Sequence, residues 1–361
     1  MALKSIRKIL AENPLLFLLV TIPFVIAAKY AGWGDLWVFI FSAIGVVPLA
    51  GLIGQSTEAL AAYTSPRIGG LLNATLGNAA ELIITLVAIK AGFLELVKAS
   101  ITGSILGNLL FVLGMAMFVG GRKNGPQKFD RRRACNHAVL LTLAVLALVI
   151  PSFFGQTIGS DSSPKVEALS LGVAIVMMAL YALGLLYSFG SAKSPISYEP
   201  DTETRRHPGM SLRSTLVLLG AATVGVVVLS EFLVGAVEHV VSSFHISEFF
   251  LGIILIPIVG NAAEHFVAVQ MAHRNKMDLG VEIAVSSSLQ IALFVAPLLV
   301  FVSLLLGHPL TLVFNPFELM ALGAGVLITV LVSSDGESNW LEGAAMMGVY
   351  LILAIAFFLL P

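Results

Sequence analysis

Long apolar runs separated by short polar loops are the feature that most restricts how this 361-residue chain can fold. Hydrophobic residues make up 58% and charged residues 11% of the chain, whereas an average soluble domain carries about 25% charged residues. A membrane-spanning helix needs about 20 mostly apolar residues, and eleven runs reach this length, some of them only with their flanks. We therefore predict an all-α integral membrane protein with eleven transmembrane helices, at residues 14–28, 36–62, 68–89, 99–120, 134–150, 166–189, 214–241, 249–272, 279–306, 313–332 and 340–360.

The positions of the basic residues predict how these helices are oriented. If alternate loops lie on opposite sides of the membrane, every Lys and Arg except Lys29, Lys90, Lys98 and Lys165 falls on the side of the N-terminus. Because cytoplasmic loops are enriched in basic residues, we expect a cytoplasmic N-terminus and a C-terminus outside. Residues 1–30 are interpreted as a first transmembrane helix. A cleaved signal peptide is the alternative, since this run is short and follows basic residues.

Composition and motifs exclude or disfavour several other classes of protein. The net charge of -1 gives no basic surface for a nucleic acid. The single cysteine, Cys135, cannot form an internal disulfide. The sequence contains no HExxH, Walker or GxSxG motif and no cysteine and histidine spacing suited to zinc, so neither an enzyme nor a resident cofactor is predicted.

A five-residue sequence, Gly-Asn-Ala-Ala-Glu, occurs twice, at Gly77–Glu81 and again 183 residues later at Gly260–Glu264. The same offset aligns further residues of the helix that follows each copy. We interpret residues 36–190 and 214–361 as two repeats of five helices, joined by a cytoplasmic linker at residues 191–213. Because five is an odd number, the second repeat enters the membrane inverted, an arrangement found in many secondary transporters.

Both copies contain residues that disfavour a continuous helix. Gly-Asn pairs have poor helix propensity, and Pro257 precedes the second pair by three residues. We expect both helices to be broken at these pairs, near the membrane midplane, so that backbone carbonyl groups become available as ligands.

Each copy also places a carboxylate, Glu81 or Glu264, inside an apolar run. Taking one ionisable side chain into hydrocarbon costs roughly 3 kcal/mol or more, and such residues usually mark an ion pathway. Two carboxylates close together cannot both stay ionised in a dry, empty site, so they must take up protons or a divalent cation. Ca²⁺ accepts six to eight oxygen ligands, which fits two carboxylates with nearby amide and carbonyl oxygens. The predicted cation and proton site consists of Glu81, Glu264, Asn78, Asn261, Gly77 and Gly260.

Two further groups of polar residues are candidates for supporting roles. The first group lies on the helices that follow the two Gly-Asn-Ala-Ala-Glu copies, which we call the signatures. Its residues either contact the ion site or only pack helices together. This group contains Ser104, Asn108, Ser287 and Gln290. The second group either forms a proton pathway or gate or has only a structural role. In the structural role, the carboxylates reach water at the membrane interface and the histidine packs between helices. This group contains Glu58, Glu231, Glu238 and His265.

Several segments of the sequence resemble those of a known family. The signatures, with the segments at residues 66–75, 230–238 and 335–343, resemble those of the calcium/proton exchangers. The resemblance implies eleven helices, two inverted five-helix repeats and a central calcium site held by Glu81 and Glu264. Relatives from fungi and plants have a long N-terminal extension and an acidic segment between the halves. This sequence has neither, so it is similar to prokaryotic members, which implies the plasma membrane.

We accordingly expect an antiporter that exchanges cytoplasmic Ca²⁺ for H⁺ by alternating access, with the lipid bilayer as its surroundings and oligomerisation left open. A sodium-coupled calcium exchanger is the closest alternative, since a calcium site can often hold sodium. A calcium-permeable channel is a second alternative and an intramembrane metal hydrolase a third, although the histidines lack ligand spacing around the carboxylates.

Overall fold

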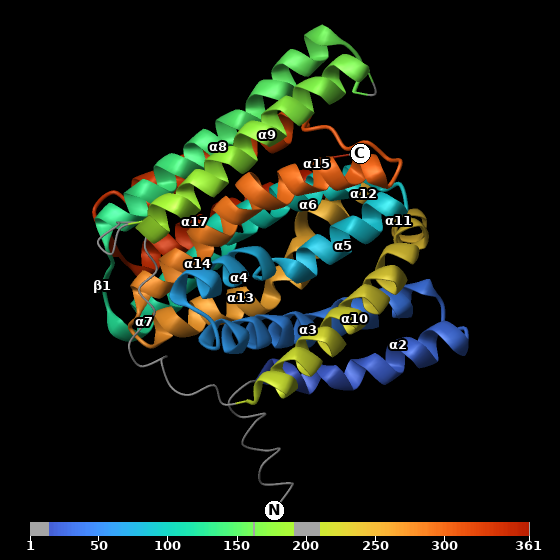
Figure 1. Ribbon diagram of the computed structural model, residues 1–361, viewed down its shortest axis with the longest axis horizontal. Coiled ribbons are helices and arrows are strands. Elements are labelled where there is room, and N and C mark those ends of the chain that lie inside the picture. Colours follow the sequence, from blue (N-terminus) through green and yellow to red (C-terminus); the bar gives the residue numbers. More distant parts are fainter. Residues whose placement is uncertain (1–13, 162, 191–209, 361) are drawn as a thin grey trace, which may run out of the picture. The chain divides into compact units, whose positions relative to one another are not determined.

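A computed structural model of the chain describes residues 14–161, 163–190 and 210–360 and is nearly all helical (Figure 1). The basic N-terminal segment and most of the predicted linker, residues 191–209, lie outside the described residues. Within the described part, eight helices are long and apolar enough to cross a membrane: Asp35–Ala62, Leu94–Asn124, Arg131–Gly155, Pro164–Tyr187, Leu212–Phe244, Glu248–His273, Met277–Leu305 and Trp340–Leu359. Two shorter apolar helices are Pro14–Tyr30 and Pro316–Val332.

Contacts between residues divide the chain into two compact units. Unit 1 comprises Met1–Val87, Arg205–Glu248 and Val259–Ala263, and unit 2 comprises Ala88–Thr204, Phe249–Ile258 and Glu264–Pro361. Each unit therefore combines segments from both predicted repeats.

The described helices of unit 1 are η1 (Pro14–Val20), α2 (Thr21–Tyr30), α3 (Asp35–Ala62), α4 (Pro66–Leu76), most of α5 (Ala79–Lys90), α10 (Leu212–Gly235) and α11 (Val237–Phe244). Helix α3 is the centre of this unit, because α2, α4, α10 and α11 all pack against it (Figure 1). Its buried face includes Val46 and Ile53, and α10 contributes Leu229 and Leu233. Helix α4 packs against α3, and the first signature begins directly after α4.

The first helices of unit 2 are α6 (Leu94–Leu106), η2 (Gly107–Val112), α7 (Leu113–Asn124), α8 (Arg131–Ile158) and α9 (Pro164–Gly190). They are followed by α12 (Glu248–Phe250), η3 (Leu251–Leu255), α14 (Met277–Gln290), η4 (Ile291–Val295), α15 (Ala296–Leu305), α16 (Pro316–Val332) and α17 (Trp340–Leu359). Helix α13 (Ile256–His273) contributes residues to both units. The segments η2, η3 and η4 are π-helical turns within longer helices.

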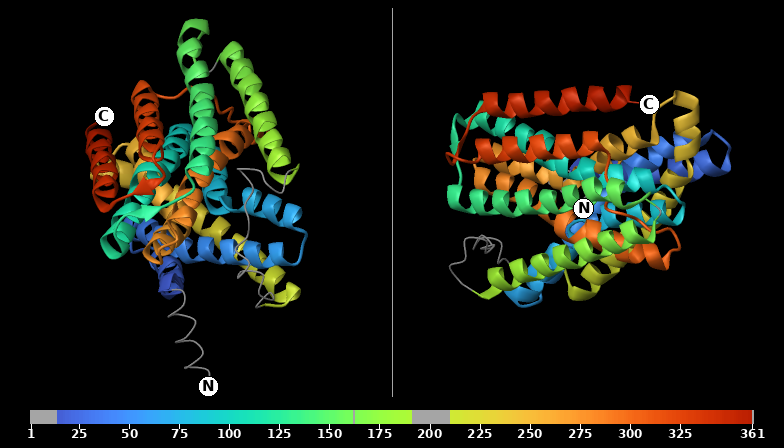
Figure 2. Two further views of the ribbon diagram at one scale, coloured as in Figure 1. Left: turned by 90° about the vertical axis from the view of Figure 1, so that its left-hand side faces the viewer. Right: turned by 90° about the horizontal axis from the view of Figure 1, so that it is seen from above.

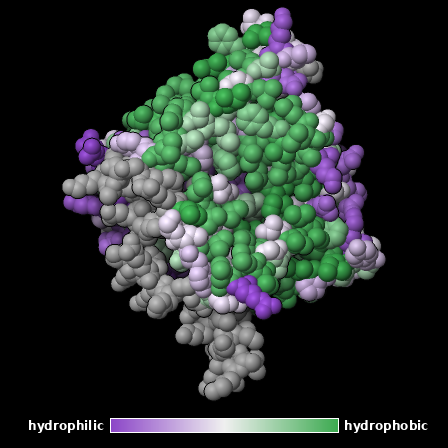
Figure 3. Space-filling view, in the orientation of Figure 1, coloured by the Kyte–Doolittle hydropathy of each residue, from purple (hydrophilic) through white to green (hydrophobic). Residues whose placement is uncertain are grey.

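The outer surface of α8 and α9 is apolar. The two helices lie side by side (Figure 1, Figure 2) and expose large hydrophobic side chains, among them Leu143, Phe153 and Leu183. Figure 3 shows hydrophobic residues over these helices and hydrophilic residues near the loop that joins them. This distribution suits helices that face lipid rather than water.

The loops of unit 2 form two groups of contacts. In the first group, strand β1 (Gln127–Lys128) pairs antiparallel with β2 (Glu337–Ser338), and the Gln127 amide donates to the Ala272 carbonyl at 3.0 Å. In the second group, Lys98 forms an ion pair with Asp161 at 3.4 Å. Loops predicted on the cytoplasmic side therefore contact one another, and so do loops predicted on the opposite side. The predicted helical fold is supported by the nearly all-helical structure, to which β1 and β2 add one pair of two-residue strands.

The predicted breaks in the signature helices have different outcomes. A turn at Gly77–Asn78 separates α4 from α5, so the first break is confirmed. The prediction for Gly260–Asn261 is wrong, because α13 runs without interruption from Ile256 to His273. The irregularity lies upstream, where Pro257 has no N–H to donate and η3 precedes it.

Candidate ion-binding site

Glu81 lies in the first turn of α5 and is only 1% exposed. Its carboxylate Oε2 accepts a hydrogen bond from the Asn261 amide at 3.3 Å, within unit 1. A Cβ at Gly260 would lie 3.4 Å from the Glu81 Cβ, an ordinary van der Waals distance, so α13 contacts α5 at this point.

Residues 260–263 of the second signature therefore lie with the first signature in unit 1. The buried Asn261 of the second copy donates to the buried glutamate of the first, and Asn78 is buried as well, with 4% exposure. The Asn78 carbonyl accepts from the Leu82 N–H at 2.9 Å, so the turn does not free this carbonyl as expected. The amide side chains of Asn78 and Asn261 remain candidates to provide neutral oxygen ligands for a cation beside Glu81.

Glu264 lies in unit 2, where it is half-buried on α13. The Ser287 hydroxyl of α14 donates to its Oε2 at 2.8 Å, a distance typical of a hydrogen bond to a carboxylate. Ser287 is 4% exposed, and Gln290 lies on the same helix and is half-buried. Among the described residues, Glu264 forms no ion pair with a basic side chain.

A second polar contact in unit 2 joins His265 to Asn108 of η2. Nε2 of His265 lies 3.0 Å from the Asn108 amide oxygen, so Nε2 carries the hydrogen in this arrangement. Asn108 is 1% exposed, and its Nδ2 has no hydrogen-bond partner among the described residues. Ser104, one turn earlier on α6, is equally buried. Of the predicted supporting residues, Ser287 thus contacts Glu264 of the second signature, and Asn108 contacts His265, the residue that follows the signature.

The predicted gate carboxylates lie elsewhere. Glu58 of α3, Glu231 of α10 and Glu238 of α11 are all exposed. Exposure at these positions is compatible with access to water or to the membrane interface, and a role in proton transfer stays a prediction.

Several buried polar side chains were not singled out from the sequence. Ser56 of α3 and Ser230 of α10 are fully buried in unit 1, and their hydroxyls have no partner among the described residues. Glu318 of α16 is 3% exposed. A carboxylate near the start of an apolar run, three residues after Asn315, is a helix-capping signal that the sequence does carry.

The described residues also limit the kind of ion that the site can hold. They contain no group of three or more His, Cys, Asp or Glu side chains placed to hold a metal ion. A transported cation would therefore need amide, hydroxyl or backbone oxygens in addition to carboxylates, which is a ligand set for Ca²⁺ rather than zinc. Glu81 and Glu264 belong to different units, and each has its own hydrogen-bonded surroundings.

Comparisons with known proteins cover nearly the whole chain. Residues 34–190 and 214–359 match the model of a family described as sodium/calcium exchanger protein. The chain is 42% identical to a Ca(2+)/H(+) antiporter of Synechocystis sp., over 96% of this chain and 97% of the relative. It is 43% identical to the Ca(2+)/H(+) antiporter ChaA of Bacillus subtilis, over 96% of this chain and 100% of the relative. The structure of native YfkE matches with a TM-score of 0.84 at 41% identity, covering 96% of this chain and 100% of YfkE.

Proposed function

The chain belongs to the sodium/calcium exchanger family, and we propose on this basis that it is an antiporter that exports cytoplasmic Ca²⁺ in exchange for H⁺. It is a membrane transporter and not an enzyme, with ions as transported substrates and no cofactor. Proton coupling is favoured over sodium coupling because the relatives at 42% and 43% identity are Ca²⁺/H⁺ antiporters.

The observation that carries the proposed site is the hydrogen bond from Asn261 to the buried Glu81. It joins the asparagine of one signature to the glutamate of the other, as a shared ion site requires. We propose that Glu81 and Glu264 together bind Ca²⁺, with the amide oxygens of Asn78 and Asn261 as further ligands. An amide can turn its oxygen toward a cation or its N–H₂ toward a carboxylate, so Asn261 can serve both the loaded and the empty state.

Exchange follows from competition for the same oxygens. A carboxylate that binds Ca²⁺ must be ionised, and a protonated carboxyl is a poor ligand for a cation. Protons that arrive from one side therefore release Ca²⁺, and Ca²⁺ that arrives from the other side releases protons. Ser287 fits this scheme, because its hydroxyl donates to the ionised form of Glu264 and can accept from the protonated form.

The two-repeat arrangement is also part of the proposal. The π-helical segments Gly107–Val112 and Ile291–Val295 coincide when the 183-residue offset of the signatures is applied, with only the first residue of η2 left over. Similar irregularities at equivalent positions support two five-helix repeats within eleven membrane crossings. In inverted-repeat transporters, alternating access arises when one part rocks against another around a central site.

Orientation is proposed from charge and from the loop contacts. The loops of unit 2 that contact one another near β1 and β2 include the basic segment at residues 121–133. Because basic loops favour the cytoplasm, we place this end and the N-terminus there, in the plasma membrane of a bacterium.

The test is Ca²⁺ uptake into proteoliposomes that contain the purified protein. We expect uptake when an outward proton gradient is imposed, and none with an equal sodium gradient or with no gradient. Uptake that is driven by the sodium gradient would instead identify the chain as a sodium-coupled member of the family. Ca²⁺ flux that needs neither gradient would indicate a channel and refute antiport.

A further inference from the structure

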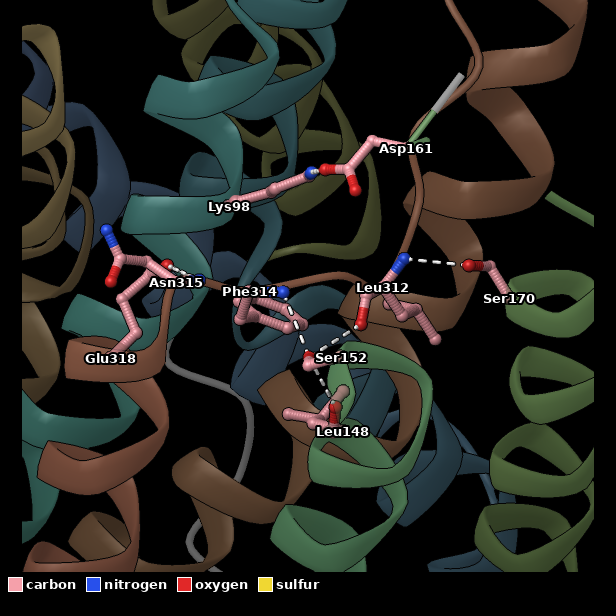
Figure 4. Close-up of polar contacts among 9 residues, drawn as sticks. All are labelled: Lys98, Leu148, Ser152, Asp161, Ser170, Leu312, Phe314, Asn315 and Glu318. Atoms are coloured by element: carbon pink, nitrogen blue, oxygen red, sulfur yellow. Dashed lines mark hydrogen bonds and ion pairs between the residues drawn. The ribbon is translucent and has the colours of Figure 1, made fainter. Parts of the chain in front are cut away.

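A non-helical segment leads into α16 and is fixed by serine side chains. After α15 ends at Leu305, alternate backbone N–H groups from Leu310 to Phe314 donate to serine hydroxyls. Leu310 donates to Ser303 at 2.8 Å, Leu312 to Ser170 at 3.0 Å and Phe314 to Ser152 at 2.9 Å; the last two contacts are drawn in Figure 4. The three serines belong to α15, α9 and α8, so the segment has one position relative to these helices of unit 2.

The fixed segment ends at Asn315, which caps α16. Its side chain accepts from the Phe317 N–H at 2.9 Å, and its own N–H donates to Oε2 of Glu318 at 2.8 Å. This reciprocal pair is a capping box. The other carboxyl oxygen of Glu318, Oε1, is buried and has no hydrogen-bond partner among the described residues.

The groups that face Glu318 come from α6. The Thr102 hydroxyl lies close enough to act on the carboxyl but is not in hydrogen-bond geometry, and Thr102 Oγ1 also lacks a partner in the described part of the chain. The charged groups that face Glu318 are Lys98 and Glu95; α8, η2 and α17, which also pack against α16, contribute none among the described residues. Lys98 is extended toward Asp161, with which it forms its ion pair (Figure 4).

Glu318 is thus a buried carboxyl group whose second oxygen is unused by the cap. Burying an ionised carboxylate is unfavourable unless it is paired, and Lys98 already has a partner in Asp161. One carboxylate cannot supply the six to eight oxygens that Ca²⁺ prefers, and no cluster of acidic side chains surrounds it in the described residues. A single proton is the ligand that one carboxyl oxygen can hold.

We propose that Glu318, with the Thr102 hydroxyl as its partner, is a proton-binding site of this transporter separate from Glu81 and Glu264. The proton binds Oε1, and a small movement of the side chains then lets the protonated carboxyl form a hydrogen bond to Thr102 Oγ1. When it leaves to water at the face where α16 begins, the Thr102 O–H donates to Oε1 instead. A hydroxyl can serve both states because it is donor and acceptor. The inference rests on the proposed function, in which protons cross the membrane through this protein.

A matched control exists in α17. Its capping box joins Asn339 to Glu342, whose carboxylate accepts from the Asn339 N–H at 3.2 Å. Glu342 is half-buried and carries no unpartnered buried oxygen among the described residues, whereas Glu318 does. Glutamine also satisfies a capping box, so Glu318→Gln and Glu342→Gln both preserve the cap and remove only the ability to bind a proton.

The test that does not depend on transport is infrared spectroscopy of the purified full-length protein in lipid, titrated across neutral pH. We expect a protonated-carboxyl band that titrates in the wild type and in Glu342→Gln, that is lost in Glu318→Gln, and that shifts in Thr102→Val. If the titrating bands of Glu318→Gln equal those of Glu342→Gln, the site is refuted. If Glu318→Gln does not fold, an unshifted spectrum of Thr102→Val refutes it.

Transport in the same lipid separates this inference from the proposed function. We expect Glu318→Gln to lose part of the pH dependence of Ca²⁺ uptake that Glu342→Gln retains. If wild-type uptake does not depend on the proton gradient, the proposed function is refuted. The infrared result still shows whether Glu318 binds a proton. If wild-type uptake is proton-driven and both variants have the same pH profile, only the role of Glu318 in transport is refuted.

Discussion

Replacing Ser287 with alanine tests the surroundings of Glu264 most sharply. The Ser287→Ala substitution removes one hydroxyl, whose 2.8 Å hydrogen bond to Oε2 is the polar contact that orients this carboxylate toward α14. A hydrogen bond to a charged group contributes about 1.5–3 kcal/mol. Because Glu264 is half-buried and water can replace part of the lost contact, we expect the lower end, about 1.5 kcal/mol. Losing a donor to the ionised carboxylate favours the protonated form, which competes with Ca²⁺, so Ca²⁺ binding at a pH where the two compete weakens by up to about tenfold.

The assay is calorimetric Ca²⁺ titration of the purified protein, with Ser288→Ala as the control. Ser288 is the next residue on α14 and fully buried, but its hydroxyl donates to the Ala284 carbonyl of its own helix at 3.0 Å. We expect this control to bind Ca²⁺ as the wild type does. Equal affinities for the two variants, or a larger loss in Ser288→Ala, would show that Glu264 does not bind the ion in the arrangement described.

Three further substitutions have expected outcomes. Asn261→Ala should weaken Ca²⁺ binding at least as much as Ser287→Ala does in the same titration, because it removes a proposed oxygen ligand of the ion as well as the 3.3 Å contact to Glu81; a smaller loss would contradict the ligand role of Asn261. Gly103→Ala should lower the melting temperature, by overpacking worth about 1–3 kcal/mol, since its Cβ would overlap the Ile253 carbonyl, whereas Gly107→Ala, with open space around it, should not. Ser152→Ala leaves the buried Phe314 N–H without its acceptor, so hydrogen exchange there should accelerate; unchanged exchange would refute the role of the serine.

The positions of the helices could be predicted because a helix that spans the membrane must be mostly apolar over about 20 residues. The predicted runs 36–62 and 340–360 correspond closely to Asp35–Ala62 and Trp340–Leu359. The ends of some helices were predicted less accurately. The run predicted to end at residue 150 continues to Ile158, because Pro151 is accommodated inside α8. Polar residues such as Glu95 extend α6 beyond its apolar run.

The sequence singles out the residues of the proposed site, but the contact between the two signatures could not be predicted. The signature repeats identify Glu81 and Glu264 as unusual in an apolar chain, yet no local pattern indicates that Asn261 donates to Glu81 across 180 residues. The continuous helix at Gly260 was missed because helix propensity is a weak signal: glycine and asparagine disfavour a helix locally, yet α13 continues through both residues. Glu318 was missed because its burial depends on packing against α6.

The most direct test of the central claim measures Ca²⁺ uptake and proton efflux together in proteoliposomes, with Glu81→Gln, Glu264→Gln and the control Glu342→Gln. We expect the wild type and the control to move both ions with a fixed ratio, and each signature variant to lose both fluxes together. Coupled exchange that survives either signature substitution would contradict a transport site built on the two carboxylates.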